Sequence, residues 1–438
     1  MKIAIIGTGI SGLAAAFRLY RHHDIELFEA NSYIGGHTNT VRVELDDEVQ
    51  NVDTGFIVFN PRNYPGFQSI LDEIGVESQP TKMSFSVTDS DGKFEYNGTN
   101  LNRLFAQRSN LLRPGFYGMI RDIMRFGRDV KQLLESPATQ NESVEEFVAR
   151  NGYRDLFVQR YLVPLGAALW SCPTQTFKQF PIRFVGEFLA NHFMLQIGGR
   201  PQWRVIKGGS SRYVEKLVQP FHDKINLNCP IQSVSRTNEK VRIRTNSESI
   251  EFDHVIFACH ADQALRLLAD PTALESELLS LFPYQKNEIY LHTDSSVLPK
   301  RKLAWAAWNA KILTRPKGNP ESDPQEDRAA VSYNMNILQS LESRHTFCVT
   351  LNESSEIAPE SMLGQFTYHH PLFTISRSEA IRRHQELLNV NRSSFCGAYW
   401  GYGFHEDGVQ SAFRVADTIE RSQRQHESSP AVATGVSA

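Results

Sequence analysis

The first thirty residues pass from an apolar run to a helical pattern and back to a strand pattern. Residues 2–6 form a mostly apolar run of the length expected for a buried parallel strand. Between Ile10 and His22 the apolar positions have helical spacing, and residues 24–29 have the composition of a second strand. This order predicts a parallel β-α-β unit at the start of the chain.

The middle of the chain alternates between α/β signals and a helical, aromatic-rich stretch. Residues 41–52 are predicted as a hairpin, and the pattern from Tyr64 to about Trp203 is helical, interrupted by a turn at Asp91-Gly92. Short strands and one short helix return after Trp203. The elements predicted within these stretches are strands at 85–87, 94–96, 231–234, 241–245 and 255–258 and a helix at 213–217.

The last third of the chain combines alternating runs with a glycine cluster. An antiparallel sheet is predicted from runs at 289–292, 303–308, 331–335 and 347–351. Residues 315–328, rich in proline, glycine and acids, are expected to form a solvated loop within this sheet. A glycine-rich block at 395–408 precedes a helix predicted from Val409 to about Ser422, and the composition beyond it is typical of disorder.

Together these elements predict an α/β protein in which a second domain is inserted into the first. The first domain is predicted to comprise residues 1–65, 203–268 and 391–423. An α+β substrate domain, carrying the antiparallel sheet, is predicted to comprise residues 66–202 and 269–390. Residues 424–438 are predicted to be a disordered tail.

Composition narrows the possible partners. The 438 residues are 41% hydrophobic and 22% charged, enough for two domains, and the formal net charge of -3 gives no global reason to bind nucleic acid. No segment has the apolar length that spans a bilayer, and the first apolar run is the predicted strand rather than a signal peptide. The five cysteines lack CxxC spacing, so we expect a cytoplasmic protein with reduced thiols and no metal site.

Three glycines stand where the first strand passes into the first helix. Gly7 permits a tight turn, Gly9 lets the backbone approach a pyrophosphate, and Gly12 lets the helix pack close to the strand. Phosphates placed there face the positive end of the helix. Glu29 ends the second strand, where a carboxylate accepts hydrogen bonds from ribose hydroxyls and repels a 2′-phosphate. The motif predicts FAD or NAD; the alternative is a glycine-rich turn with a surface glutamate.

Two further glycine-bearing blocks follow, at 35–55 and 397–408, and the three blocks in this order resemble the superfamily of FAD-dependent amine oxidases, phytoene desaturases and protoporphyrinogen oxidases. The resemblance covers nearly the whole chain. Residues 291–294, 305–309, 333–336 and 403–408 are similar to a bacterial subfamily of predicted NAD/FAD-binding proteins that accompany cyclopropane-fatty-acid-synthase-like methyltransferases.

This resemblance implies a Rossmann-like FAD-binding domain of the glutathione-reductase and amine-oxidase type. It also implies FAD as cofactor, a lipid-like substrate and a functional link to a fatty-acid methyltransferase. Val234 is expected to hold the adenine through backbone contacts, and a helix beginning at Gly408 and Val409 to stabilise charge at flavin N1 and O2. The cofactor-binding residues implied are Gly7, Gly9, Ile10, Ser11, Gly12, Glu29, Ala30, Gly35, Gly36, His37, Thr38, Gly55, Phe56, Val234, Gly397, Glu406, Asp407, Gly408 and Val409.

The chain departs from the superfamily pattern at three places. Many relatives carry an arginine where this chain has His37 and a glutamate where it has Tyr399. Amine-oxidising relatives place a lysine near flavin N5, on the strand that here includes residues 287–292; Lys286 precedes that stretch and His292 lies on it. These departures weaken the case for amine oxidation.

Two histidines are the candidates for acid-base catalysis. His405, with Glu406 and Asp407, has the composition of a group at the flavin edge, but the same residues suit the start of a helix. His292 with Asp294 fits a proton relay or an ordinary hydrogen-bonded pair. The flavin itself takes the hydride, so the sequence does not demand a catalytic base.

Residues 116–134 have an apolar face and an opposite face with Arg121, Arg125 and Arg128. Such a helix rests on an anionic membrane surface or packs on its own domain with solvated arginines. The first alternative predicts peripheral contact with the inner membrane face.

Taken together, the sequence predicts an FAD-dependent oxidoreductase that oxidises or desaturates an apolar, fatty-acyl or lipid-like small molecule. Two alternatives remain within the same fold: a flavin-containing amine oxidase and a non-catalytic lipid-binding protein like the GDP-dissociation inhibitors. An NAD-linked dehydrogenase is disfavoured because one dinucleotide site is visible.

Overall fold

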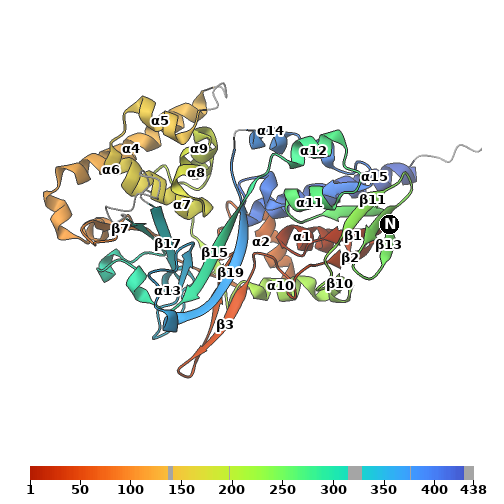
Figure 1. Cartoon of the computed structure of the whole chain (residues 1–438), viewed down its shortest axis with the longest axis horizontal. Helices are drawn as coiled ribbons and strands as arrows, with labels where there is room; N and C mark the ends of the chain where they lie inside the picture. Colours follow the sequence, from red (N-terminus) through yellow and green to blue (C-terminus); the bar gives the residue numbers. More distant parts are fainter. Residues whose placement is uncertain (137–141, 197, 314–327, 375, 429–438) are drawn as a thin grey trace, which may run out of the picture. The chain divides into compact units, whose positions relative to one another are not determined.

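The structure is a computed structural model that describes residues 1–136, 142–196, 198–313, 328–374 and 376–428 (Figure 1). The chain forms two compact units, each assembled from separate stretches of sequence. Unit 1 comprises Met1–Gly36, Val214–Leu281 and Glu379–Ala438, and unit 2 comprises His37–Tyr213 and Phe282–Ser378. These boundaries differ from those predicted: residues 37–65 and 203–213 belong to unit 2, and residues 269–281 and 379–390 belong to unit 1.

Unit 1 is built on a parallel sheet with the strand order β10-β2-β1-β14-β20. Its central strand pairs on both sides, with Ile5 opposite Leu27 in β2 and opposite Ile256 in β14. Strands β2 and β14 both run parallel to β1. The pairing of β1 with β2 confirms the β-α-β unit predicted at the start of the chain. The five strands are β1 (Lys2–Ile6), β2 (Asp24–Phe28), β10 (Ile225–Asn226), β14 (His254–Phe257) and β20 (Ser393–Phe395).

Helices α1 (Ile10–Leu19) and α15 (His405–Ser428) of unit 1 pack against each other (Figure 1). Nearly every side chain of α1 is buried, which explains its run of alanines between Leu13 and Phe17. The remaining elements of unit 1 are an antiparallel sheet of β11 (Ser233–Arg236), β12 (Val241–Arg244) and β13 (Ser249–Phe252), helices α11 (Ala261–Leu267) and α12 (Ala273–Leu279), and 3-10 turns at Gln219–Lys224, His384–Leu387 and Ala398–Trp400. Helices α10 (Ser211–Val218) and α14 (Arg377–Arg382) cross the unit boundaries.

Helix α15 is longer than the sequence pattern predicted. It begins at His405 rather than Val409 and continues to Ser428, so residues 424–428 are helical and not part of a disordered tail. The rest of the predicted tail lies outside the described residues, as does most of the loop predicted at 315–328.

Unit 2 holds the predicted antiparallel sheet, with the strand order β19-β15-β18-β17-β16-β7-β8. All neighbours in it are antiparallel except β16 and β7. The strand predicted at 303–308 is wrong, because a 3-10 turn occupies Lys302–Ala304 and the strand begins at Trp308. The strands are β7 (Phe85–Asp89), β8 (Glu95–Asn97), β15 (Tyr284–His292), β16 (Trp308–Leu313), β17 (Arg328–Asn334), β18 (Cys348–Leu351) and β19 (Met362–Pro371).

The predicted hairpin of unit 2 is formed by β3 (Thr40–Leu45) and β4 (Glu48–Asp53). Its turn residues Asp46 and Asp47 both have positive φ, 44° and 64°, the geometry that matches the twist of paired strands. A smaller sheet joins β5 (Val58–Phe59), β9 (Arg204–Ile206) and β6 (Ser78–Pro80).

The predicted helical stretch of unit 2 contains one long helix, α4 (Pro114–Glu135), and several short ones. The short helical elements are α2 (Pro65–Ile74), α3 (Leu101–Leu104), a 3-10 turn at Arg108–Leu112, α5 (Val144–Asn151), α6 (Asp155–Phe157), a π-helical segment at Val158–Leu162, α7 (Val163–Trp170), α8 (Thr174–Lys178) and α9 (Ile182–Asn191). Outside this stretch, α13 (Met335–Leu338) follows β17. Within the described ranges, no helix is both long and apolar enough to cross a membrane.

Candidate functional site

The three glycines of the turn between β1 and α1 differ in backbone conformation and in the room that each leaves for a side chain. Gly7 has a φ of +104°, which side chains rarely adopt. A Cβ at Gly12 would lie 2.0 Å from the carbonyl oxygen of Gly7, whereas a Cβ at Gly9 would meet nothing within 4 Å. Gly12 is therefore required by packing, while the free space at Gly9 opens beside the N-terminus of α1 and fits a diphosphate.

Glu29 lies at the end of β2, and only 6% of it is exposed. Its Oε2 accepts hydrogen bonds from Thr8, at 3.0 Å from the backbone nitrogen and 2.6 Å from Oγ1. Its Oε1 accepts from the backbone nitrogen and the side-chain amide of Asn31, both at 2.9 Å. The carboxylate is thereby fixed beside the glycine turn, and Ala30, which follows it, is exposed.

The second glycine block lies against the first. The backbone nitrogen of Gly35 donates to the carbonyl of Thr8 at 3.1 Å. Gly36 has a φ of +59°, and a Cβ there would lie 3.0 Å from Cα of Gly9. The two blocks thus form one cradle of closely spaced backbone, as a bound diphosphate requires.

Helix α15 brings the far end of the chain to the same place. A Cβ at Gly408 would lie 2.8 Å from Oγ of Ser11 and 2.9 Å from Cγ2 of Ile10, so the first turns of α15 and α1 are in contact. Val409 is fully buried next to this contact. Two positive helix ends therefore lie side by side, and an anionic group placed before them is stabilised by both.

The block before α15 is held by local hydrogen bonds. The backbone nitrogen of Gly397 donates to Oγ of Ser411 at 2.9 Å. Asp407 accepts from the backbone nitrogen of Phe404 at 2.8 Å, and Glu406 accepts from Nε2 of Gln410 at 2.7 Å. Both acids thus have structural partners at the helix start, and His405 beside them is only 9% exposed.

The carbonyl of Val234 is not free for an adenine, because it already accepts from the backbone nitrogen of Ala269 at 2.9 Å. Ile231 is placed better. Two residues before it, the backbone nitrogen of Cys229 donates to the carbonyl of Glu29 at 2.8 Å, which ties this segment to the end of β2. Neither the N–H nor the carbonyl of Ile231 has a protein partner in the described part of the chain. Sequence reasoning missed Ile231 because its strand begins two residues later than predicted, at Ser233.

Cys396 and His384 are uncharged neighbours of the C-terminal block. Burial raises the pKa of the Cys396 thiol well above its usual range, which disfavours the thiolate that a covalent link to flavin needs. Burial also lowers the pKa of His384 to about 3, and its ring stacks on Trp400 with centroids 4.1 Å apart.

In unit 2, the residues that follow Gly36 are packed rather than open. A Cβ at Gly55 would lie 1.9 Å from the carbonyl oxygen of His37, and Phe56 donates its backbone N–H to that carbonyl at 2.8 Å. Thr38 Oγ1 lies 2.6 Å from the hydroxyl of Tyr213. Desolvation lowers the pKa of His37 to about 4, so this ring is neutral where relatives carry an arginine.

A chain of amides in unit 2 fixes the proton of His370. The backbone nitrogen of Glu288 donates to Oδ1 of Asn352 at 2.8 Å, so the Nδ2 of Asn352 is the donor to Oδ1 of Asn287 at 2.6 Å. Asn287 Nδ2 is then the donor to Nδ1 of His370 at 2.7 Å. Because Nδ1 accepts, the neutral ring carries its proton on Nε2.

Tyr368 completes this polar cluster, which we define as His37, Asn39, Thr54, Asn287, Asn352, Tyr368 and His370. The Tyr368 hydroxyl lies 3.0 Å from the amide nitrogen of Asn39 and 2.9 Å from Oγ1 of Thr54. The ring of His37 lies 5.0 Å from that of Tyr368 and 5.3 Å from that of His370. The sequence signal for the cluster is the i, i+2 spacing of Tyr368 and His370, which places both on one face of β19.

His292 belongs to the interior of the sheet in unit 2, whereas His405 belongs to unit 1. His292 is fully buried, and its Nε2 lies 2.8 Å from Oγ1 of Thr350. Burial lowers its pKa to about 4. Asp294 accepts from the backbone nitrogens of Ser296 and Ala358, so its carboxylate serves the local turn.

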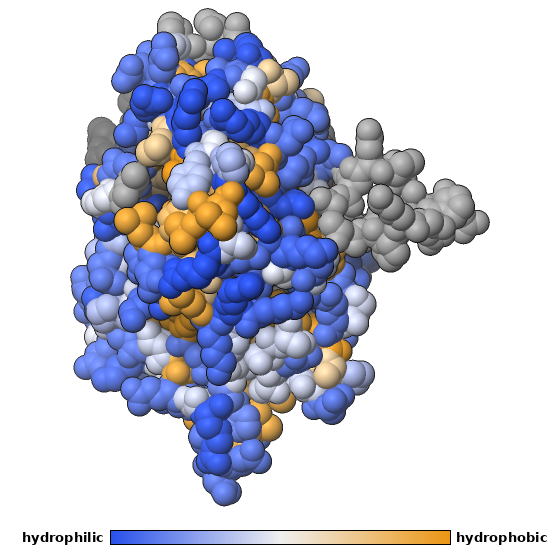
Figure 2. Space-filling model, turned by 90° about the vertical axis from the view of Figure 1, so that its left-hand side faces the viewer, coloured by the Kyte–Doolittle hydropathy of each residue, from blue (hydrophilic) through white to orange (hydrophobic). Residues whose placement is uncertain are grey.

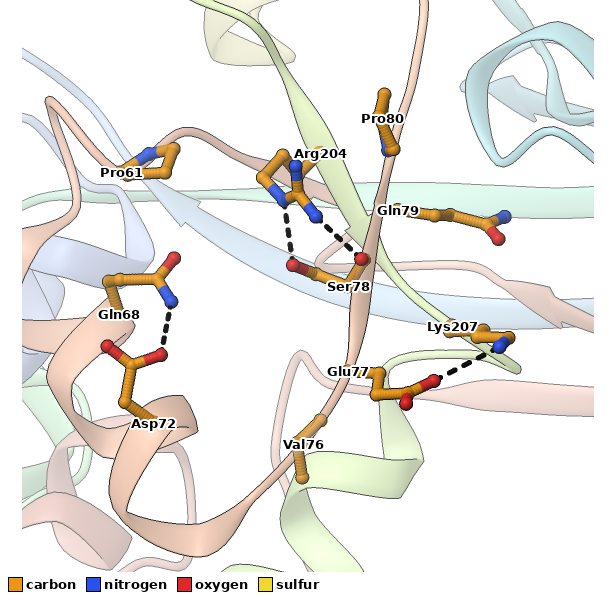
Figure 3. Close-up of a pocket in the computed structure, with 10 residues that line it drawn as sticks. All are labelled: Pro61, Gln68, Asp72, Val76, Glu77, Ser78, Gln79, Pro80, Arg204 and Lys207. Carbon is orange, nitrogen blue, oxygen red and sulfur yellow. Dashed lines mark hydrogen bonds and ion pairs between the residues drawn. The ribbon is translucent and has the colours of Figure 1, made fainter.

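A hollow of about 510 Å³ in unit 2 is chemically unlike this cluster (Figure 3). Its polar side chains pair with one another: Lys207 with Glu77 at 3.0 Å, Gln68 with Asp72 at 2.7 Å, and Arg204 with Ser78 at 2.8 Å (Figure 3). The polar lining makes it unsuited to an apolar ligand. It is lined by Pro61, Gln68, Asp72, Val76, Glu77, Ser78, Gln79, Pro80, Arg204 and Lys207.

Comparison with known proteins places this geometry among flavoproteins. The chain is 23% identical over 280 residues to the flavin-containing amine oxidase A of Sus scrofa, over 59% of this chain and 49% of that protein. It therefore spans about half the length of the curated relatives it matches.

Many solved structures share its fold, including the following two. The cyclohexylamine oxidase of Brevibacterium oxydans superposes with a TM-score of 0.67 at 14% identity, over 97% of this chain and 99% of that one. A fatty acid isomerase from P. acnes that produces CLA superposes with a TM-score of 0.65 at 17% identity, over 96% and 98% of the two chains.

The family model described as flavin containing amine oxidoreductase matches residues 10–420. This match runs from the first turn of α1 nearly to the end of α15, the two helices whose N-termini meet. The chain accordingly belongs to the family of flavin-containing amine oxidoreductases, and its cofactor is FAD.

Proposed function

We propose that the protein is an FAD-dependent oxidoreductase that removes hydride from a C–H bond of an apolar, fatty-acyl or lipid-like substrate. Bound FAD supplies the hydride acceptor. The space at Gly9 and the paired helix ends of α1 and α15 suit the diphosphate, and Glu29 stands at the end of β2, the place of the ribose-binding acid in such a fold. The unpaired backbone of Ile231 suits the adenine.

The observation that carries the choice of substrate is the side-chain pattern of β15. Lys286 points outward: 63% of its side chain is exposed, and Nζ lies 2.7 Å from Oε1 of Glu288. The next residue, Asn287, is fully buried and joins the polar cluster. This strand therefore offers an amide, not the lysine of amine-oxidising relatives, to the interior of unit 2.

The two histidines of the polar cluster are uncharged, and the neighbouring Asp53 carboxyl already accepts hydrogen bonds from Thr40 and Ser210. His37 is neutral above about pH 4, and the amide chain holds a neutral His370 with its proton on Nε2. Trp308, Tyr333 and Phe366 pack against the apolar core cluster that includes Tyr368. An alkylammonium ion would lose its hydration here without gaining a counter-charge from these side chains, whereas an acyl chain loses nothing.

The test is anaerobic reduction of the bound flavin, measured as the loss of its visible absorbance. Purified holoprotein is mixed with fatty acids, acyl phospholipids and a panel of primary amines. We expect the acyl compounds to bleach the flavin and the amines to leave it oxidised. Bleaching by amines alone would assign amine oxidation, and a flavin that dithionite reduces but no panel member reduces would favour the non-catalytic lipid-binding alternative.

A matched pair of variants tests the role given to β15. Lys286→Met should change the rate of bleaching less than about twofold, because that side chain faces solvent. Asn287→Leu should slow bleaching by about tenfold or more, since it removes the side-chain partner of the Asn352 amide and of Nδ1 of His370. Loss of activity in the Lys286 variant alone would contradict the proposal.

A further inference from the structure

The segment that leads into α4 exposes large apolar side chains. Leu112 is 86% exposed and Leu101 75%, and Leu111, Tyr117 and Met124 are each close to half exposed. These five residues define the apolar tip. In Figure 1 the segment lies, in orange, at the left-hand edge of unit 2, and Figure 2, which views that side, shows a hydrophobic patch bordered by hydrophilic residues.

The apolar tip is distinct from the apolar stripe of α4. Met119, Phe126 and Val130 of that stripe are buried in unit 2, so the stripe itself is not available to a membrane. The exposed face of α4 instead carries Tyr117, Arg121, Met124, Arg128 and Lys131, which follow one another at helical spacing.

The tip is held on a fixed scaffold. The Tyr117 hydroxyl donates to the carbonyl of Leu111 at 3.0 Å, which joins α4 to the preceding 3-10 turn. Arg108 donates to the carbonyl of Phe105 at 2.8 Å and to Oδ1 of Asn102 at 2.7 Å. The exposed leucines therefore protrude from hydrogen-bonded backbone.

Charge decides what kind of partner covers this tip. Residues 101–131 contain seven basic residues and two acidic ones, a difference of five positive charges. Both acids have partners within unit 2: Asp122 is buried with Arg154 at 2.7 Å, and Asp129 accepts from the Tyr153 hydroxyl at 2.6 Å. The basic residues are Arg103, Arg108, Arg113, Arg121, Arg125, Arg128 and Lys131.

We propose that the apolar tip inserts into the surface of an anionic lipid bilayer while the basic residues around it contact lipid headgroups. Protruding leucines next to arginines match the layered chemistry of such a surface, apolar below and negative above. A second copy of the chain fits worse, because a two-fold contact through this surface would bring its positive charges together. The inference depends on this surface alone and not on the proposed substrate.

The test is co-sedimentation of the full-length holoprotein with vesicles of phosphatidylcholine, with and without phosphatidylserine. We expect binding to the anionic vesicles only, weakened at about 0.5 M NaCl, where the Debye length is roughly 4 Å. The variant Leu111→Ser/Leu112→Ser should bind the anionic vesicles at least about tenfold more weakly than the parent. The variant Arg121→Gln/Arg128→Gln should bind the anionic vesicles about thirtyfold more weakly, because each basic residue at such a surface raises the affinity about fivefold.

Matched controls exchange other exposed residues: Val49→Ser on the hairpin of unit 2 and Arg244→Gln on β12 of unit 1. Both should bind vesicles like the parent, and all variants should retain the parent's flavin content. No sedimentation with anionic vesicles at low salt would overturn the proposal. So would leucine variants that bind vesicles normally but lose a dimer seen by light scattering, since that result assigns the tip to a second copy.

Discussion

Replacing Gly9 with alanine separates cofactor binding from folding. Gly9 has φ -66° and ψ 175°, which alanine adopts without strain, and its Cβ would meet no protein atom within 4 Å. Alanine is a poorer N-cap than glycine by up to about 1 kcal/mol. It also reduces the freedom of the unfolded chain, a gain of roughly 0.4–1 kcal/mol that offsets the loss. The free energy of unfolding of the apoprotein should therefore change by less than about 1 kcal/mol.

The same methyl group would occupy the space that the diphosphate needs. Overpacking of a close contact costs about 1–3 kcal/mol, which corresponds to roughly 5- to 150-fold weaker binding of FAD. FAD binding is measured by titrating the apoprotein with FAD and recording the quenching of flavin fluorescence. The free energy of unfolding is measured by urea unfolding of the same apoprotein.

Two further glycines serve as controls for this experiment. Gly198→Ala, also without a contact within 4 Å but located in unit 2, should change neither quantity. Gly12→Ala should prevent folding of unit 1, because its Cβ would lie 2.0 Å from a backbone oxygen. If Gly9→Ala binds FAD as tightly as the parent, the assignment of the turn to the diphosphate is refuted.

Three more predictions concern stability and the flavin linkage. Burial raises the pKa of Asp53 from 3.8 to about 6, so the folded state binds its proton more tightly and loses stability as pH rises through this window. From about pH 4 to about pH 7 the free energy of unfolding of the parent should thus fall by roughly 3 kcal/mol more than that of Asp53→Asn, measured by urea titration; parallel curves would contradict the reasoning. Arg236 and Glu275 form a pair with only 3% of each side chain exposed, so Arg236→Met should lower the free energy of unfolding by about 3–5 kcal/mol, and a loss below about 1 kcal/mol in a urea melt would show that the pair contributes little. Because the Cys396 thiol is neutral, acid precipitation should release all the flavin into the supernatant; yellow colour retained in the pellet would indicate a covalent link.

The parts of the fold that the sequence predicted well have strong local patterns. Strands β1 and β14 are apolar after their first residues, and the turn of β3 and β4 carries two aspartates that tolerate positive φ. Strand β19 was missed because it lies at the edge of its sheet and alternates polar with half-exposed residues, which weakens the period-two signal. Helix α15 was predicted too short because its first turn is rich in polar residues and glycine.

The candidate site was predictable where a motif has one physical meaning. The glycines of the first turn have the spacing that packing and phosphate approach demand, and the structure shows open space at Gly9 and close packing at Gly12. The spacing of Tyr368 and His370 did not suffice to predict the polar cluster, because Asn287 and His370 come from separate strands, Asn352 follows a third, and the three meet only through sheet register. Which of Val234 and Ile231 keeps a free backbone likewise depends on tertiary pairing.

The parallel sheet of unit 1 draws its strands from both ends of the chain, and this affects how the protein is made. Strand β1 is synthesised before its neighbour β14, which begins only at His254, a delay of roughly 10–50 s at typical rates of synthesis. The first turn of α15, which meets that of α1, emerges later still. The apolar β1 must therefore wait with one edge unpaired, exposed to aggregation or guarded by a chaperone. A nascent chain stalled before residue 405 would have no complete flavin cradle, so the cofactor site is complete only after α15 has been synthesised.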